Sequence, residues 1–432
     1  MEDKLTKFNE WWITKKVKES LLEKYKRPLF FDILRYLDRR QIILITGLRR
    51  VGKTTLMYQL IQELLDKKTD SRNIIYFSFD EDIVDFDNLI KIYEDKVLKQ
   101  GLRERIKEGR IYIFLDEIQK CKNWQNKIKI LYDLYPKLKF IISGSASVQI
   151  DKKAKESLAG RIFDFLLQPL MFEEFLEWKS IKVDKGNLEI FQREALPYFY
   201  DYLRKGGFPE IVDEDEDEKI KSYIKNTVIE RIIYRDLPEE FGARDYELLK
   251  TLVEMIAVEP GMIVNYDSLS RKLHRDKRTI MNYFFYLEYS MLIKLIANYR
   301  KGFLVSSRKL RKVYIGNTSI SFGLVEAFYS NRFLEKIYEN YAIIETGARN
   351  YYRNSYEIDI VLKKDQRIIP IEIKFGEADT DAIFRFLSEF DIKKGIVLTK
   401  DIFDKKTNNK KEILLVPLWA FSIMKEKYLM QW

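Results

Sequence analysis

The chain has 432 residues, with 77 Lys and Arg against 67 Asp and Glu, and a formal net charge of +10. This length predicts about two to four domains, and a hydrophobic content of 46% excludes global disorder. No uninterrupted apolar run reaches the length of a membrane-spanning helix, and the single Cys excludes an intrachain disulfide. With one His beside it, a classical zinc site is excluded too. No apolar signal-peptide core follows Met1, so we expect a cytoplasmic protein whose basic charge suits a polyanionic partner.

The first chemical signal is a glycine loop between an apolar run at residues 42–45 and a helix-like segment at residues 56–61. In a strand, loop and helix of this order, the backbone N–H groups of the loop cradle phosphate oxygens. Lys53 would reach the β- and γ-phosphates, and the Thr54 hydroxyl would ligate Mg²⁺. The loop predicts a site for ATP or GTP, formed by Gly47, Leu48, Arg49, Arg50, Val51, Gly52, Lys53 and Thr54. An alternative for Arg49 is contact with DNA or with a neighbouring subunit.

A second signal follows the near-continuous apolar run at residues 111–115, which is typical of a strand buried on both faces. Asp116 at the end of this run is expected to hold Mg²⁺ through water. Glu117 would then orient and polarise the attacking water. The alternative is that the two acids open a surface loop.

Two further apolar runs predict strands that are followed by polar residues. Residues 140–142 end at Ser143, and either Ser143 or Ser145 is the candidate sensor of the γ-phosphate; a simple turn is the alternative. Residues 74–77 lead to Asp80, for which the signal is weaker. Strands that alternate with helical segments predict a parallel sheet with helices on both faces and a ligand at the carboxyl ends of its strands.

These segments resemble an AAA-type prokaryotic (archaeal-type) P-loop ATPase fused to a C-terminal domain of uncharacterised function. The resemblance rests on Gly47 to Thr55 and on residues 114–120, 143–145, 158–161, 168–176 and 206–210. It implies a loop that includes Thr55, ATP as the nucleotide, and a homo-oligomer or protein partner as an open alternative. Arg161 is a candidate for stabilising the transition-state charge, in its own subunit or in a neighbour, and its alternative is a structural pair with a carboxylate.

Residues 181–248 are expected to form a helical linker or lid. This segment contains six consecutive acids, Asp213 to Glu218. We interpret them as a solvated turn between helices, with an acidic plug over a basic groove as the less favoured alternative.

Residues 249–325 have the outline of a winged helix-turn-helix. An apolar stripe at residues 252–257 predicts one helix, residues 267–273 and 277–288 predict two more, and residues 292–296 alternate as a strand. His274 is interpreted as a helix-end residue. In this outline the third helix enters a DNA major groove. The candidate nucleic-acid contacts are Arg271, Lys272, Arg275, Lys277, Arg278 and Thr279, with residues 306–312 as an added basic patch. The alternative is a winged helix that contacts only protein.

The third chemical signal lies in residues 326–432. Asp359 and the pair Glu372 and Lys374 fall on two predicted neighbouring strands and resemble the PD-(D/E)xK nuclease core. The two carboxylates would hold Mg²⁺ beside a scissile phosphate, and Lys374 would position or activate water. Glu339, on a predicted helix, is the candidate third metal ligand, with Glu345 in reserve. The alternatives are surface ion pairs, or a nuclease-like fold retained as an inactive binding platform.

The sequence therefore predicts an α/β chain of four parts. Residues 1–180 would form a P-loop ATPase domain with a parallel sheet, and residues 181–248 a helical linker. Residues 249–325 would form a winged helix, and residues 326–432 a restriction-endonuclease-like α/β domain. We expect an ATPase that couples nucleotide state to DNA binding, with Mg²⁺-dependent cleavage by the last domain left open. The alternatives are a non-nucleolytic DNA-binding regulator and a signalling ATPase with a protein partner and no nucleic acid.

Overall fold

The computed structural model describes residues 2–80, 85–145, 157–300, 311–325, 330–364, 367–377 and 379–430. The chain forms two compact units, Met1–Gln168 and Pro169–Trp432. Within these described ranges, no helix is long and apolar enough to cross a membrane.

The first unit is built on a parallel sheet with the strand order β2-β3-β4-β1-β5. Strands β1 to β4 are buried along their whole length because apolar side chains occupy both of their faces. Strand β5 lies at the edge and is only partly buried. The parallel sheet predicted from the sequence is therefore confirmed. Its strands are β1 (Ile42–Thr46), β2 (Ile74–Ser78), β3 (Ile111–Asp116), β4 (Leu138–Gly144) and β5 (Ile162–Leu166).

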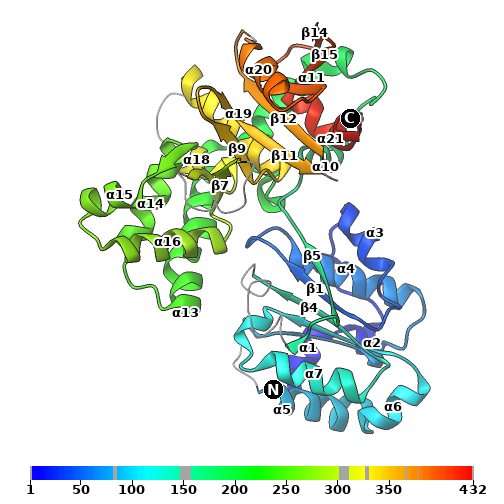
Figure 1. Cartoon of the computed structure of the whole chain (residues 1–432). Coiled ribbons are helices and arrows are strands. Elements are labelled where there is room, and N and C mark those ends of the chain that lie inside the picture. The colour runs from blue at the N-terminus through cyan, green and yellow to red at the C-terminus, as the bar shows by residue number, and fades with distance from the viewer. Residues whose placement is uncertain are drawn as a thin grey trace. The chain divides into compact units, whose positions relative to one another are not determined.

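Helices cover both faces of this sheet, with α4 on one side and α5 and α7 on the other (Figure 1). Alternate strand residues such as Ile42 and Leu44 share a core with Trp124 and Ile128 of α7. The helices are α1 (Glu2–Phe8), α2 (Trp11–Thr14), α3 (Pro28–Leu34), α4 (Lys53–Asp66), α5 (Phe86–Ile92), α6 (Leu102–Glu108) and α7 (Trp124–Leu134). Short 3-10 turns lie at Glu19–Leu21, Ser71–Asn73 and Ile118–Lys120, and a π-helical turn lies at Tyr93–Leu98.

The N-terminal helices cover the β2 edge of the sheet. The Asn9 side chain donates to the Tyr76 carbonyl at 2.9 Å and accepts from the Tyr76 N–H at 2.7 Å. The indole N–H groups of Trp11 and Trp12 donate to the Ile74 carbonyl at 3.1 and 2.8 Å. These side chains satisfy backbone groups that an edge strand otherwise leaves unpaired.

The second unit begins with helices that precede the other sheets. They are α10 (Phe172–Trp178), α11 (Leu188–Lys205), α12 (Asp217–Ser222) and α13 (Leu237–Phe241). A 3-10 turn lies at Pro209–Ile211, and π-helical turns lie at Tyr223–Ile229 and Ile232–Asp236.

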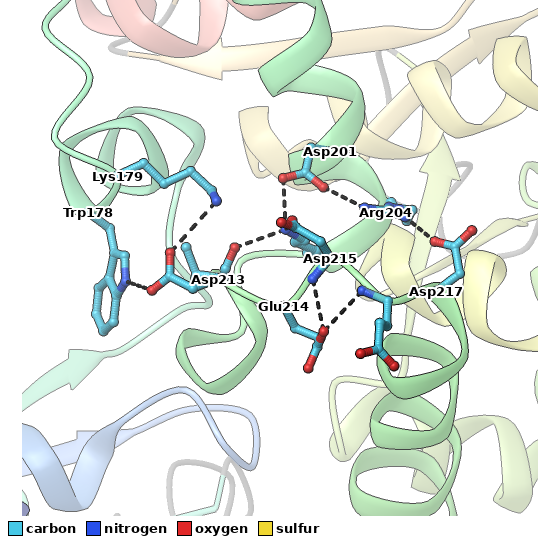
Figure 2. A network of polar contacts seen from close by, with 11 residues as sticks. Trp178, Lys179, Asp201, Arg204, Asp213, Glu214, Asp215 and Asp217 are labelled. Carbon is cyan, nitrogen blue, oxygen red and sulfur yellow. Dashed lines mark hydrogen bonds and ion pairs between the residues drawn. The ribbon is translucent and has the colours of Figure 1, made fainter.

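The acidic run that follows α11 pairs with basic side chains in the same unit (Figure 2). The buried Lys205 ammonium lies 2.9 Å from Asp201 and 3.3 Å from Asp215, and it donates to the Val212 carbonyl at 2.9 Å. Asp213 lies 3.7 Å from Lys179. The run lies between helices and its acids are exposed except for the half-buried Glu214, as predicted for a solvated turn, while alternate acids also balance buried or half-buried cations.

Residues 246–315 form a module in which helices pack on a small antiparallel sheet. Strands β6 and β7 both pair with β8. The side chains of Asp245 and Asn265 cap the starts of α14 and α15, each accepting a backbone N–H at 3.0 Å. His274 ends α15 in a left-handed conformation with φ of 50°, as expected for a helix-end residue. The elements in chain order are α14 (Tyr246–Val258), β6 (Met262–Val264), α15 (Tyr266–Leu273), α16 (Lys277–Tyr289), β7 (Ile293–Asn298) and β8 (Arg311–Ile315).

The sheet of this module continues into the C-terminal segment, because β7 also pairs in parallel with β9. The full strand order is β10-β9-β7-β8-β6, so the predicted boundary at residues 325 and 326 falls between strands of one sheet. Asn340 ties α19 to β8, since its side chain accepts from the Ile315 N–H at 2.8 Å and donates to the Ile315 carbonyl at 2.9 Å. The elements around this junction are α18 (Thr318–Leu324), α19 (Asn331–Thr346), β9 (Asn350–Arg353) and β10 (Glu357–Ile358).

A mixed sheet with the order β11-β12-β13-β15-β14 completes the unit. Strands β12, β13 and β15 are parallel, and β11 and β14 pair antiparallel at the two edges. The elements are β11 (Ile360–Lys364), β12 (Arg367–Lys374), α20 (Asp381–Glu389), β13 (Lys394–Thr399), β14 (Asp404–Asn408), β15 (Lys411–Pro417) and α21 (Leu418–Met430).

Candidate functional site

Polar side chains from several elements meet on Asp116 at the carboxyl edge of the first sheet. Asp116 is 3% exposed, at the end of β3. The Thr54 hydroxyl donates to its Oδ2 at 2.6 Å, and the Tyr76 hydroxyl donates to the same oxygen at 3.0 Å. The Ser143 hydroxyl donates to Oδ1. The strand order explains the arrangement, because β4 lies between β1 and β3 and so brings Ser143 beside Asp116.

The glycine loop between β1 and α4 has the shape of a phosphate cradle. Gly52 precedes α4 with φ of 94°, a left-handed conformation that favours glycine. A Cβ on Gly47 would lie 2.1 Å from the Leu167 carbonyl oxygen, so any larger residue is excluded there. The buried Lys53 ammonium donates to the carbonyls of Gly47 and Leu48 at 3.2 Å each. Its charge therefore lies inside the loop at the N-terminus of α4, where the ammonium group and the helix dipole would both attract an anion.

The remaining loop residues support this shape. Leu48 and Val51 are buried. Arg50 is exposed with φ of 66°, and Thr55 is half-buried. Arg49 lies 3.7 Å from Asp80, which also pairs with Lys120 at 2.5 Å. Asp80 therefore forms ion pairs with both of these cations.

Glu117 follows Asp116 in a left-handed backbone conformation with φ of 51°. Its N–H donates to Asp116 Oδ1 at 3.1 Å and to Ser143 Oγ at 3.4 Å. Its half-buried carboxylate accepts from the Gln119 amide at 2.6 Å. Because a β-strand does not continue through such a conformation, the chain turns here and Glu117 stays at the edge of the sheet.

Arg161 is the one catalytic candidate of this unit that the described residues do not bring to the site. It immediately precedes β5, and its carbonyl accepts the N–H of Ile42 at the amino end of β1. The glycine loop follows the carboxyl end of β1, about 15 Å away along five strand residues. Arg161 instead pairs with Asp133 at 3.2 Å. In this arrangement Arg161 forms the pair with a carboxylate that the structural alternative expects, and its catalytic role stays a prediction.

The residues at this edge fit a nucleotide with Mg²⁺. The Thr54 hydroxyl and the Asp116 carboxylate are hard oxygen donors of the kind that Mg²⁺ prefers, and they already lie within hydrogen-bond distance. The buried Thr46 hydroxyl, just before the loop, has no hydrogen-bond partner among the described residues. Thr54 and Asp116 would hold the cation, which would neutralise phosphate charge, and the loop and Lys53 would hold the phosphates.

The candidate nucleic-acid residues gather on α15, on α16 and on the turn between them. Arg271, Lys272 and Arg278 are exposed, and Thr279 is half-buried. Arg275 and Lys277 are also exposed, but each pairs with a carboxylate of the same unit: Arg275 with Asp245 at 2.6 Å and Lys277 with Asp267 at 2.8 Å.

The predicted basic patch at residues 306–312 needs correction at one position. Residues 306–310 lie outside the described residues, and Arg311 is exposed. Lys312 is buried, because β8 turns its side chain towards carboxylates of the C-terminal segment. It is therefore no part of a surface patch.

Asp359, Glu372 and Lys374 come together as the sequence predicts. Ile360 pairs with Ile371 across antiparallel strands β11 and β12, which places Asp359 opposite Glu372. Asp359 Oδ2 accepts the Ile373 N–H at 2.9 Å. Lys374 donates to Glu372 Oε1 at 3.0 Å.

The helical glutamates do not complete a third metal ligand. Glu339 Oε1 accepts from the Tyr314 hydroxyl at 2.5 Å and pairs with Lys312 at 3.2 Å. Glu345 is buried against Lys425 at 3.0 Å and accepts from Tyr341, so the reserve candidate is a structural ion pair. Among the described residues, no group of three or more acidic, His or Cys side chains is placed to hold a metal ion. The prediction that Glu339 ligates a metal does not fit this arrangement, because Lys312 and Tyr314 already engage it.

The environment of the carboxylate pair favours a bound proton or cation. Burial raises the pKa of Asp359 well above its usual range, and the nearby charges of Glu372 and Glu339 raise it further. Burial also raises the pKa of Glu372, although Lys374 opposes the shift. Glu372 is 6% exposed, and its Oε2 has no hydrogen-bond partner in the described part of the chain. Two carboxylates, one with an unsatisfied buried oxygen, fit Mg²⁺, which proteins often bind through one or two carboxylates and water.

The parallel sheet, the glycine loop and the Asp116 cluster together define a P-loop nucleotide-binding domain. Residues 39–176 match the family described as "AAA domain". This segment, which holds the glycine loop and the Asp116 cluster, is thus similar to AAA domains. Residues 196–328 match a "Domain of unknown function (DUF8612)", and residues 324–421 match a "Domain of unknown function (DUF4143)".

Two curated relatives are similar over nearly their whole length. An uncharacterized protein of Haemophilus influenzae is 26% identical over 412 residues, which cover 90% of this chain and 96% of that protein. Uncharacterized protein MJ1544 of Methanocaldococcus jannaschii is 28% identical over 422 residues, covering 91% of this chain and 90% of that protein.

Solved structures give weaker likenesses. The Aeropyrum pernix ORC1 protein, solved in complex with DNA, has a TM-score of 0.31 at 16% identity and covers 68% of this chain and 90% of that chain. Caenorhabditis elegans PCH-2 has a TM-score of 0.27 at 13% identity and covers 66% of this chain and 72% of that chain.

Several residues of these sites carried no signal of their own in the sequence. Tyr76 and Gln119 contact Asp116 and Glu117, and Lys312 and Tyr314 contact Glu339. Tyr76 could have been found from the strand order, since it pairs with Phe114 on the neighbouring strand, two residues before Asp116. Lys312 lies in a run of basic residues that resembles a solvated patch. The local composition therefore predicts an exposed side chain, whereas Lys312 is buried.

Proposed function

We propose that the chain binds and hydrolyses ATP with Mg²⁺ at the Asp116 edge of the first sheet. The observation that carries this proposal is the meeting of Thr54, Asp116 and Ser143 beside the Lys53 loop in a segment that matches an AAA domain. Lys53 and the loop N–H groups would orient the phosphates and balance their charge. Glu117 would accept a proton from the attacking water, and Ser143 would hold Asp116 and the Glu117 N–H in place.

We further propose that residues 246–315 are a winged helix that binds DNA and that nucleotide state controls this binding. The element order α14-β6-α15-α16-β7-β8 supports the winged-helix assignment. Exposed cations at the start of α16 and on α15 support contact with phosphates. Asp245 and Asp267 would have to release Arg275 and Lys277, or share them with the phosphates.

The exposed face of α16 favours a second candidate, a protein partner. Met281 is 46% exposed and Phe285 is 48% exposed on the same helix as Arg278. Exposed Met and aromatic side chains are enriched at protein interfaces. In this alternative the ATPase would bind protein through α16 and would bind no nucleic acid.

One titration separates the two candidates. DNA affinity for a short duplex is measured against salt concentration, with and without ATP and Mg²⁺, for the native chain, Lys53→Ala and Arg278→Ala. We expect a steep log–log slope that falls by about 0.9 in Arg278→Ala, and a nucleotide effect that Lys53→Ala abolishes. Arg332→Ala, an exposed arginine outside α15 and α16, should retain the native slope. No DNA binding at low salt would favour the protein partner, and tight ATP binding by Lys53→Ala would refute the loop assignment.

We also propose that α19 to β13 form a nuclease-like core around Asp359 and Glu372. The observed pairing of β11 with β12 and the Lys374 contact support it. A nicking assay with Mg²⁺ or Mn²⁺ on plasmid, branched and single-stranded DNA tests cleavage. Cleavage that persists in the Asp359→Ala, Glu372→Ala double variant would exclude this site.

A further inference from the structure

Lys312 brings a buried positive charge into the carboxylate cluster from a different part of the fold. Its side chain is 8% exposed on β8, a strand of the module formed by residues 246–315. The ammonium lies 3.2 Å from Glu339 Oε1 and pairs with Glu357. Although burial opposes it, the charges of Glu339, Asp359 and Glu357 raise the pKa of Lys312, so it stays a cation at neutral pH. One charged side chain thus joins β8 to α19 and β10.

The cluster holds more negative than positive groups. Glu339, Glu357, Asp359 and Glu372 contribute four carboxylates. The cations are the buried or half-buried ammonium groups of Lys312 and Lys374 and the exposed guanidinium of Arg353, which lies 3.5 Å from Glu357. An independent observation points to a further cation: the buried Oε2 of Glu372 has no partner within the described residues. Glu372 and Asp359 face each other across β11 and β12, so this unpartnered oxygen belongs to the same strand pair as the second carboxylate.

We propose that Asp359 and Glu372 bind a divalent cation in competition with the Lys312 ammonium, which holds Glu339 and strand β8 to the same cluster. This inference rests on the nuclease-like site proposed above. Because a cation at Asp359 would repel Lys312, metal binding weakens the hold of the cluster on β8. Conversely, a displacement of β8 withdraws Lys312 and releases Glu339 as a third carboxylate. Metal binding and the position of a strand in the DNA-binding module are then linked, and the linkage is reciprocal.

The size of the effect follows from Coulomb repulsion between the ammonium and the divalent cation. At a separation of several ångströms and an effective dielectric constant near that of a protein surface, removing the ammonium is expected to raise metal affinity about tenfold or more. Arg at this position keeps the charge and should leave the affinity within about twofold of the native value.

The test measures Mn²⁺ affinity of the full chain by electron paramagnetic resonance, with Asp116→Asn as the background so that the proposed cation site beside the glycine loop does not contribute. The variants are Lys312→Gln, Lys312→Arg and the double variant Lys312→Gln, Glu357→Gln. The double variant keeps the net charge and leaves no isolated buried carboxylate from this pair, so it protects against loss of folding. Lys405→Gln, an exposed lysine paired with Glu412, is the matched charge control. Circular dichroism checks each fold.

Tighter Mn²⁺ binding in Lys312→Gln and in the double variant, with native affinity in Lys312→Arg and Lys405→Gln, is the expected result. Unchanged or weaker Mn²⁺ binding in folded Lys312→Gln and double variants would overturn the inference. Asp359→Asn distinguishes a failure of the proposed metal site from a failure of the competition with Lys312. If native Mn²⁺ affinity survives in Asp359→Asn, the nuclease-like site itself fails; if it is lost there but insensitive to Lys312, only the competition fails.

Discussion

Replacing Glu117 by Gln tests the assignment of the attacking-water base most directly. The substitution keeps the size of the side chain, and Gln119 can still donate to the new amide oxygen across the native 2.6 Å contact. The backbone bonds from the Glu117 N–H to Asp116 and Ser143 are also unaffected. The variant should therefore keep its geometry and lose only the proton acceptor. General base catalysis contributes about 10²- to 10⁴-fold, so we expect kcat for ATP hydrolysis to fall by this factor.

A graded control comes from Gln119→Leu, which keeps the base and removes its hydrogen bond. A hydrogen bond to a charged group contributes roughly 1.5–3 kcal/mol, and the lower end applies because both side chains are half-buried. A loss near 1.4 kcal/mol is about a tenfold fall in kcat. We therefore expect kcat to be highest in the native chain, lower in Gln119→Leu and lowest in Glu117→Gln.

The assay is single-turnover phosphate release combined with calorimetric ATP affinity. Nucleotide affinity should change by less than about threefold in both variants, because neither residue is assigned to phosphate binding. Native turnover in Glu117→Gln would refute the assignment of the base. Equal losses in both variants would show that Glu117 acts through position rather than through proton transfer.

Two stability measurements test other parts of the structure. Gly47→Ala should lower the free energy of unfolding by about 3 kcal/mol or more because its Cβ would meet the Leu167 carbonyl at 2.1 Å, whereas Gly160→Ala, with open space around it, should cost about 1–2 kcal/mol for its left-handed φ; equal losses in urea denaturation would disprove the close contact. The hydrogen bond from Arg275 holds the pKa of Asp245 below its usual range, so this carboxylate stabilises the fold at neutral pH and the contribution is lost as pH falls through its folded pKa. The difference in unfolding free energy between native and Asp245→Asn should therefore shrink below about pH 4, and a difference constant from pH 7 to 3 would contradict this pairing.

Local chain chemistry accounts for what the sequence predicted well. The buried parallel strands, the glycine loop and the acids after residue 115 follow from hydrophobic runs and turn residues, which act within a few neighbours. The same is true of α15, α16 and the opposition of Asp359 to Glu372. These features needed no knowledge of which distant segments pack together.

Other features depend on long-range packing. Arg161 lies at the amino end of β5, and only the parallel pairing of β5 with β1 shows that this end faces away from the loop. Lys312 follows several basic residues in sequence, yet the pairing of β8 with β6 and β7 carries it into the interior. The acidic run is exposed as predicted, but its pairing with the buried Lys205 gave no signal in the sequence. Charge patterns in sequence do not reveal such tertiary partners.

The pairing of β7 with β9, together with the Asn340 bond to β8, has a practical consequence for anyone who wishes to study the C-terminal segment in isolation. A fragment that starts at residue 326 would lack β7, which pairs with β9. It would also lack the Ile315 backbone groups to which the Asn340 amide is hydrogen-bonded. A recombinant fragment should therefore start before residue 246, so that it contains all the strands of the shared sheet.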